Sequence, residues 1–187
     1  MNLYSYLVVA DRYSGWVCAY YFKPGEATAR SLINIFRQLF SDYGVSEEVS
    51  SDGGPQFKAE EFDNFLKKWG VAHRKSSVDY PQSNGRAEVA VKTAKRILKE
   101  NVGTQGKINT DTAARAILQY RNTPLQDCNL SPAQILFHPQ LRDTIPAHPS
   151  QYHLHPEWTS AAMKREISYH EKNRAVSEGS SRSPNQQ

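Results

Sequence analysis

Short apolar runs alternate with helical patterns along most of this chain, and this alternation restricts the fold more than any other feature of the sequence. Four runs have the length and the β-branched or aromatic content of strands, and they span 4–10, 16–22, 45–51 and 71–75. Apolar residues recur with the period of an α-helix in the segments 26–43, 59–69, 86–101, 110–122 and 131–137. Strands that alternate with helices predict an α/β domain with a mixed sheet flanked by helices.

The length and the punctuation of the chain predict one domain followed by additional segments. The 187 residues suit a single compact domain with some chain to spare. We expect a core domain at 1–137, a proline-rich extended segment at 138–158, a helix at 159–176 and a disordered tail at 177–187.

Hydropathy and charge narrow the environment in which the chain works. No stretch approaches the roughly 18 consecutive apolar residues of a transmembrane helix. The first residues also lack the basic-then-apolar order of a signal peptide. We therefore expect an intracellular protein without a membrane partner. The net charge of +4 and the pI of about 9.0 are consistent with a polyanionic partner.

Asp52 is the first candidate for chemistry. It ends the predicted strand 45–51 and is followed by Gly53 and Gly54. A carboxylate at the end of a strand, beside backbone without side chains, can be approached closely by a bulky ligand. Taken alone, however, Asp52 is better explained as an ordinary Asp-Gly turn, because aspartate and glycine are both common in turns.

Glu88 is the second candidate, in the first turn of the predicted helix 86–101. At the helical period Glu88 shares one side of this helix with Lys92, Lys95 and Lys99. Apolar residues occupy the other side and should face the core; they are Ala87, Ala90, Ala94, Ile97 and Leu98. Two interpretations remain open. Glu88 either pairs with Lys92 on a solvated face, or shares a divalent metal with Asp52 while the lysines hold phosphates.

Four segments of the chain occur together, in this order, in a known family. They are LVVADRYSGW at 7–16, SSDGGPQF at 50–57, YPQSNGRAE at 80–88 and LSPAQILF at 130–137. On these segments the chain resembles retroviral and retrotransposon integrases, most closely the Ty3/gypsy class, over about 7–158. The 35 residues between Asp52 and Glu88 also match the gap between the second and third acids of the D,D-35-E triad of that family.

The resemblance implies an RNase H-like fold and a catalytic site with two Mg²⁺ or Mn²⁺ ions, used for DNA 3′-end processing and strand transfer. By position, Asp52 and Glu88 would be catalytic metal ligands. Gln82 and Asn84 would lie in the loop that touches DNA ends. The lysines Lys92, Lys95 and Lys99 would contact DNA phosphates. The implied partners are the ends of the element, target DNA and further copies of the chain, and the implied location is the nucleus.

The first acid of the triad has no clear counterpart. In the family it lies in the first strand, whereas the strand that ends at Asp11 matches the second. The missing aspartate would fall roughly a dozen residues before Asp11, given two short strands and a tight turn. Asp11 itself, beside Arg12 and Ser14, is better explained as a turn residue. We therefore expect an N-terminally truncated core that lacks the first strand and is inactive alone.

Two other functions remain open. A domesticated integrase-like protein would keep the fold and the side of helix 86–101 that carries Lys92, Lys95 and Lys99, which we call the lysine face. It would bind DNA or a protein partner without catalysis. A simple RNase H-type nuclease is disfavoured, because the YPQSNGRAE segment is integrase-like.

Overall fold

A computed structural model describes most of the chain. The described residues are 5–75, 85–101, 110–126, 128–146, 148–153, 157, 160–161, 163–165, 167–168 and 170–171. They divide into two compact units. The first unit contains 1–7 and 20–81, and the second contains 8–19 and 82–187. No helix among the described residues is long and apolar enough to cross a membrane.

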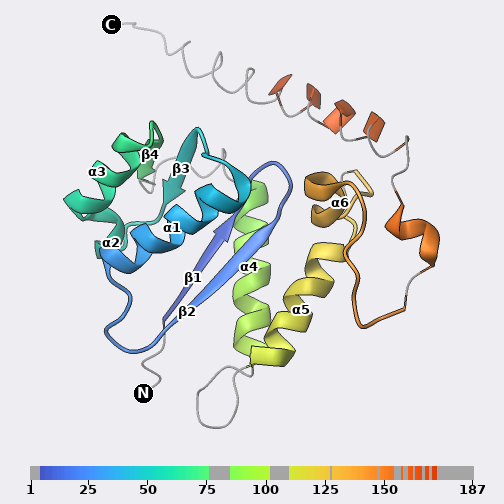
Figure 1. Ribbon diagram of the computed structural model, residues 1–187, viewed down its shortest axis with the longest axis horizontal. Helices are drawn as coiled ribbons and strands as arrows, with labels where there is room; N and C mark the ends of the chain where they lie inside the picture. Colours follow the sequence, from blue (N-terminus) through green and yellow to red (C-terminus); the bar gives the residue numbers. More distant parts are fainter. Residues whose placement is uncertain are drawn as a thin grey trace, which may run out of the picture. The chain divides into compact units, whose positions relative to one another are not determined.

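The first unit contains a parallel strand pair beside three helices. Strands β3 (Glu48–Ser51) and β4 (Ala72–Lys75) are hydrogen-bonded in register, with Val49 opposite His73 and Ser51 opposite Lys75. The helices are α1 (Ala29–Tyr43), α2 (Pro55–Lys58) and α3 (Glu60–Lys68), and α3 contacts both α1 and β4 (Figure 1).

Aromatic rings fill the core of the first unit. Phe62 on α3 is fully buried and meets three rings edge-on. The centroid distances are 5.3 Å to Phe36, 5.7 Å to Phe57 and 5.4 Å to His73. The apolar residues that recur at the helical period along α1 and α3 thus point into one cluster.

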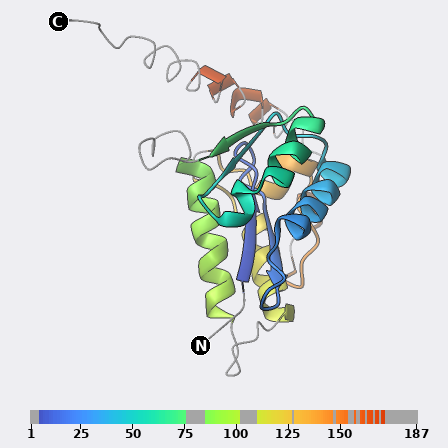
Figure 2. The same ribbon diagram turned by 90° about the vertical axis from the view of Figure 1, so that its left-hand side faces the viewer.

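The second unit packs helices against one end of a hairpin. Strands β1 (Ser5–Ala10) and β2 (Val17–Phe22) form a two-stranded sheet, of which 8–10 and 17–19 belong to this unit. Its helices are α4 (Gly85–Glu100), α5 (Thr110–Asn122) and α6 (Pro132–Phe137), with α4 and α5 side by side (Figures 1 and 2). The buried cluster of this unit consists of Val17, Ala90, Ala94 and Ile117.

Arg121 of α5 holds the start of β2. Its guanidinium lies 3.9 Å from the ring centroid of Trp16 and donates to the carbonyl of Val17 from Nε at 3.1 Å and from Nη2 at 2.7 Å. Tyr120 precedes Arg121 on α5, and its hydroxyl donates to the carbonyl of Gly15 at 3.1 Å. Burial raises the pKa of the Tyr120 phenol. These contacts join segments about one hundred residues apart in sequence.

Several elements differ from the expectations. The predicted α/β class is confirmed, but the described strands pair as two two-stranded sheets, β1 with β2 and β3 with β4, rather than as one. Strand β3 begins at Glu48 rather than at 45, where Val45 is exposed. The one-turn helix α2 is not among the predicted helices; it begins at Pro55, and proline is favoured at the first helical position because no partner is needed there for its missing N–H.

The segment 138–158 is not extended throughout. Pro149–Tyr152 forms a 3₁₀ helix, with His148 as its N-cap and proline at its first position. The described residues between 160 and 171 are helical, within the expected range 159–176, and Glu157, which was expected in the extended segment, is helical too. The expected tail at 177–187 lies outside the described residues.

Candidate functional site

Asp52 follows β3 directly, at the carboxyl end of the parallel pair. Its side chain is exposed, and Oδ1 accepts a hydrogen bond from the backbone N–H of Gly54 at 3.1 Å. Gly54 is also the N-cap of α2, whose first backbone bonds run from Phe57 and Lys58 to its carbonyl. The carboxylate is therefore held beside its own backbone and stays open to solvent.

The two glycines after Asp52 have different surroundings. A Cβ on Gly54 would lie 3.1 Å from Asp52 Oδ1 and 3.0 Å from Gln56 Nε2, which is tighter than ordinary contact. A Cβ on Gly53 would meet only the end of the flexible Lys58 side chain, at 3.7 Å. The absence of a side chain at Gly54 thus leaves room for the carboxylate in its present position.

Glu88 lies exposed in the first turn of α4, and the helix has the two faces that its sequence predicts. Lys92, Lys95 and Lys99 are exposed with it, whereas Ala90, Ala94 and Leu98 are buried. Among the side chains that the structure describes, Glu88 forms no ion pair with Lys92. The exposed face of α4 thus presents one carboxylate that no lysine of the same face neutralises.

The predicted site residues are distributed over both units. Asp52 belongs to the first unit and Glu88 to the second, so each carboxylate is described within its own unit. Gln82 and Asn84 lie outside the described residues. Within the described ranges, no three His, Cys, Asp or Glu side chains form a group that could hold a metal ion.

Asp11 is a turn residue, as expected. Its Oδ2 accepts hydrogen bonds from the backbone N–H of Ser14 at 2.7 Å and from the Ser14 hydroxyl at 2.5 Å. The Ser14 hydroxyl in turn accepts from the N–H of Trp16 at 3.1 Å, and Gly15 has a φ of 74°. One carboxylate oxygen of Asp11 therefore serves the hairpin turn.

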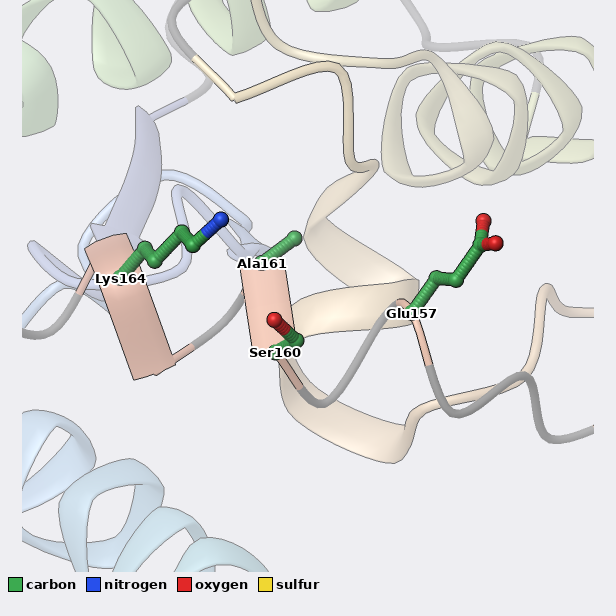
Figure 3. A pocket seen from close by; sticks show the side chains of 4 residues that line it. All are labelled: Glu157, Ser160, Ala161 and Lys164. Carbon is green, nitrogen blue, oxygen red and sulfur yellow. The ribbon is translucent and has the colours of Figure 1, made fainter.

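A shallow pocket lies on the helical segment after 156. It is lined by Glu157, Ser160, Ala161 and Lys164 (Figure 3). The Glu157 carboxylate points away from Lys164, so the charged ends do not converge on one ligand position (Figure 3). None of these four residues was predicted as a site residue, and we assign no function to the pocket.

Comparison with known proteins identifies the family. The sequence model of the Integrase core domain matches residues 2–81. An uncharacterized protein of Caenorhabditis elegans, K02A2.6, is 34% identical over 119 residues, which are 63% of this chain and 9% of that protein. The Pol polyprotein of Feline endogenous virus ECE1 is 31% identical over 137 residues, or 72% of this chain and 13% of the polyprotein. The chain thus spans only a small part of these relatives.

Solved structures identify the fold. The catalytic core domain of BIV integrase has a TM-score of 0.57 at 24% identity, over 71% of this chain and 85% of that one. The HTLV-2 integrase catalytic core, in complex with magnesium and in a trimeric form, has a TM-score of 0.55 at 21% identity, over 71% and 84%. The chain belongs to the integrase core family of retroviral type. Its fold is the RNase H-like fold of an integrase catalytic core.

Proposed function

We propose that this chain is catalytic-core sequence of a retrotransposon integrase of the Ty3/gypsy class, whose activity is DNA 3′-end processing and strand transfer. The observation that carries the proposal is the exposed Asp52 carboxylate at the carboxyl end of β3, in a chain of the integrase core family. Glu88 follows after 35 residues and is also exposed, at the start of α4.

Asp52 and Glu88 would hold a divalent metal. Carboxylate oxygens are the ligands that Mg²⁺ and Mn²⁺ prefer, and both side chains are open to solvent. A bound ion would supply stabilisation of the attacking and leaving oxygens of a phosphodiester. The magnesium complex of the HTLV-2 core supports this assignment. The protein's own contribution is to hold the Asp52 carboxylate, through the N–H of Gly54, at the end of a paired strand.

DNA would lie along the exposed face of α4. Lys92, Lys95 and Lys99 place three positive charges on the helix side that also presents Glu88. Lysines bind phosphates as point charges, which orients DNA without reading its sequence. Gln82 and Asn84, just before α4, would contact the DNA end.

The same proposal extends to organisation and location. We assign the core to 1–137 and the later segments to 138–158, 159–176 and 177–187. The trimeric and dimeric forms of the HTLV-2 core support a homo-oligomer. The simian T-cell lymphotropic virus intasome, with a TM-score of 0.59 at 22% identity over 78% of this chain and 52% of that one, supports assembly into an intasome. Action on chromosomal DNA would take place in the nucleus.

The metal assignment is tested with Mn²⁺ alone. We expect Mn²⁺ to broaden the NMR amide signals of Gly53 and Gly54 in the 187-residue polypeptide. Binding should be weak, because two carboxylates supply few of the six oxygen ligands of such an ion. Asp52→Asn should abolish the broadening at Gly53 and Gly54. Equal broadening in Asp52→Asn would refute the metal site.

A strand-transfer assay tests activity. Residues 1–187 contain two acids of the proposed triad, and the Asp11 carboxylate is engaged in the hairpin turn. The isolated polypeptide, supplied with Mn²⁺ and donor-end DNA, is therefore expected to give no strand-transfer product. A product that disappears in Asp52→Asn would show that these residues are sufficient for catalysis.

A further inference from the structure

A line of polar groups runs beneath the end of β3, inside the first unit. Val49 and Ser51 are the buried residues of β3, and the parallel register sets them opposite His73 and Lys75. Because side chains two residues apart share a face of a strand, Ser51 and His73 lie on the same face of the pair. A hydroxyl and an imidazole in such a place require hydrogen-bond partners.

Each of these groups has a partner. Ser51 Oγ lies 2.9 Å from His73 Nε2, and His73 Nδ1 lies 2.5 Å from Asp63 Oδ1 on α3. The second carboxylate oxygen, Asp63 Oδ2, accepts from Lys75 Nζ at 2.6 Å. Both ring nitrogens of His73 are engaged, and the edge-on contact with Phe62 at 5.4 Å fixes the ring further. The imidazole thus links β3, β4 and α3.

The charges set the direction of the hydrogen bonds. The pKa of the Asp63 carboxyl is held below its usual range, chiefly by the hydrogen bond from Lys75 and then by the one with His73. An ionised carboxylate only accepts, so the proton of a neutral His73 ring is on Nδ1. Nε2 is then an acceptor, and the Ser51 hydroxyl donates to it.

This order of hydroxyl, imidazole and carboxylate also occurs in serine hydrolases, where it activates a nucleophile. Here the side chain of His73 is only 8% exposed and Ser51 only 6%, on the core side of the strand. A nucleophile must reach its substrate, so the burial of Ser51 argues against hydrolysis. Ser51 is, however, joined directly to Asp52 by a peptide bond, so a fixed Ser51 side chain restricts the backbone of Asp52.

We propose that His73 is a positioning residue for Asp52: by holding the Ser51 hydroxyl it fixes the end of β3, and with it the backbone that carries the Asp52 carboxylate. This inference rests on the proposed metal site at Asp52. Partners one step behind a metal ligand commonly set its orientation. His73 acts one residue further away, through the strand itself.

The test compares Mn²⁺ affinity among variants of the 187-residue chain, measured by broadening of the Gly53 and Gly54 amide signals. We expect His73→Ala and Ser51→Ala each to weaken Mn²⁺ binding about three- to tenfold, somewhat less than the roughly 10–100-fold typical of a ligand's direct partner. If both residues act through one hydrogen bond, the double variant should lose no more Mn²⁺ affinity than the single variant that binds Mn²⁺ more weakly. Ser51→Thr, which keeps the hydroxyl, should bind nearly as the unchanged chain does.

The control is Arg74→Ala, on the same strand between the two network residues of β4. Arg74 is exposed and pairs with Glu48 at 3.8 Å, so its removal should leave Mn²⁺ affinity within about twofold, as for a surface pair. Amide spectra confirm that each variant is folded, and Ser51→Ala decides the matter if His73→Ala unfolds. Unchanged affinity in Ser51→Ala, with binding lost in Asp52→Asn, would overturn the inference and leave the metal site intact. Unchanged affinity in Asp52→Asn would overturn both.

Discussion

Phe62→Ala is expected to lower the free energy of unfolding of the first unit by about 3–5 kcal/mol, the range for large buried aromatic side chains. Phe62 is fully buried and contacts the rings of Phe36, Phe57 and His73. Its removal would leave a cavity where helices α1, α2 and α3 meet β4. Urea denaturation followed by amide hydrogen exchange in α3 and β4 measures the loss.

Phe137→Ala provides the matched control, because it makes the same chemical change at an exposed position of the second unit. The Phe137 side chain is 44% exposed, and its ring meets that of Trp16 at 5.2 Å. We expect a loss of less than about 1.5 kcal/mol, the range for a single aromatic pair. If Phe62→Ala also lost less than about 1.5 kcal/mol, the aromatic cluster would not be what stabilises the first unit.

The triple substitution Lys92→Ala, Lys95→Ala and Lys99→Ala is expected to weaken DNA binding on the order of 100-fold at 0.1 M salt. Each lysine that neutralises a phosphate contributes about 0.9 to the slope of log affinity against log salt concentration, so the slope should fall by nearly three. Fluorescence anisotropy of a labelled duplex, titrated at several salt concentrations, measures both quantities.

A second triple variant separates the lysine face from net charge. Lys23, Lys67 and Lys68 are exposed in the first unit, and their replacement by alanine removes the same three charges. Only a few-fold loss is expected there. Equal losses in the two triple variants would show that binding follows overall charge and that the exposed face of α4 is not the DNA surface.

The carboxylates distinguish the two functions that share this surface. Two results together would favour a non-catalytic DNA-binding protein. The unchanged chain would bind no Mn²⁺, and its DNA binding would survive the double substitution Asp52→Asn with Glu88→Gln. Mn²⁺ binding that requires Asp52 would favour integrase chemistry.

Local chemistry predicted much of the structure. The two faces of α4 follow from the spacing of its alanines and lysines, and the bounds of α5 were predicted without error. Ser131, at the start of the predicted helical segment 131–137, caps α6 and forms a capping box with Gln134. Asp11 and Ser14 form the turn that their types favour. In each case the decisive partners lie within one or two turns of the chain.

Contacts distant in sequence were beyond such patterns. Strand alternation marks Ser51 as core-facing, but nothing local indicates that His73 would receive its hydroxyl, or that Asp63 would hold the ring. These partners are 22 and 10 residues from His73. The division of strands between two sheets is likewise a matter of which edges meet.

The sequence by itself determined the family, the Asp52–Glu88 spacing and the exposed lysine face, because motif order and helical period are written along the chain. Only the tertiary structure decided how Asp52 is held, through the N–H of Gly54 beside it and the Ser51–His73–Asp63 line behind it. The physical reason is that a buried polar group takes its partner from whatever element packs against it, and packing joins residues that no local pattern connects.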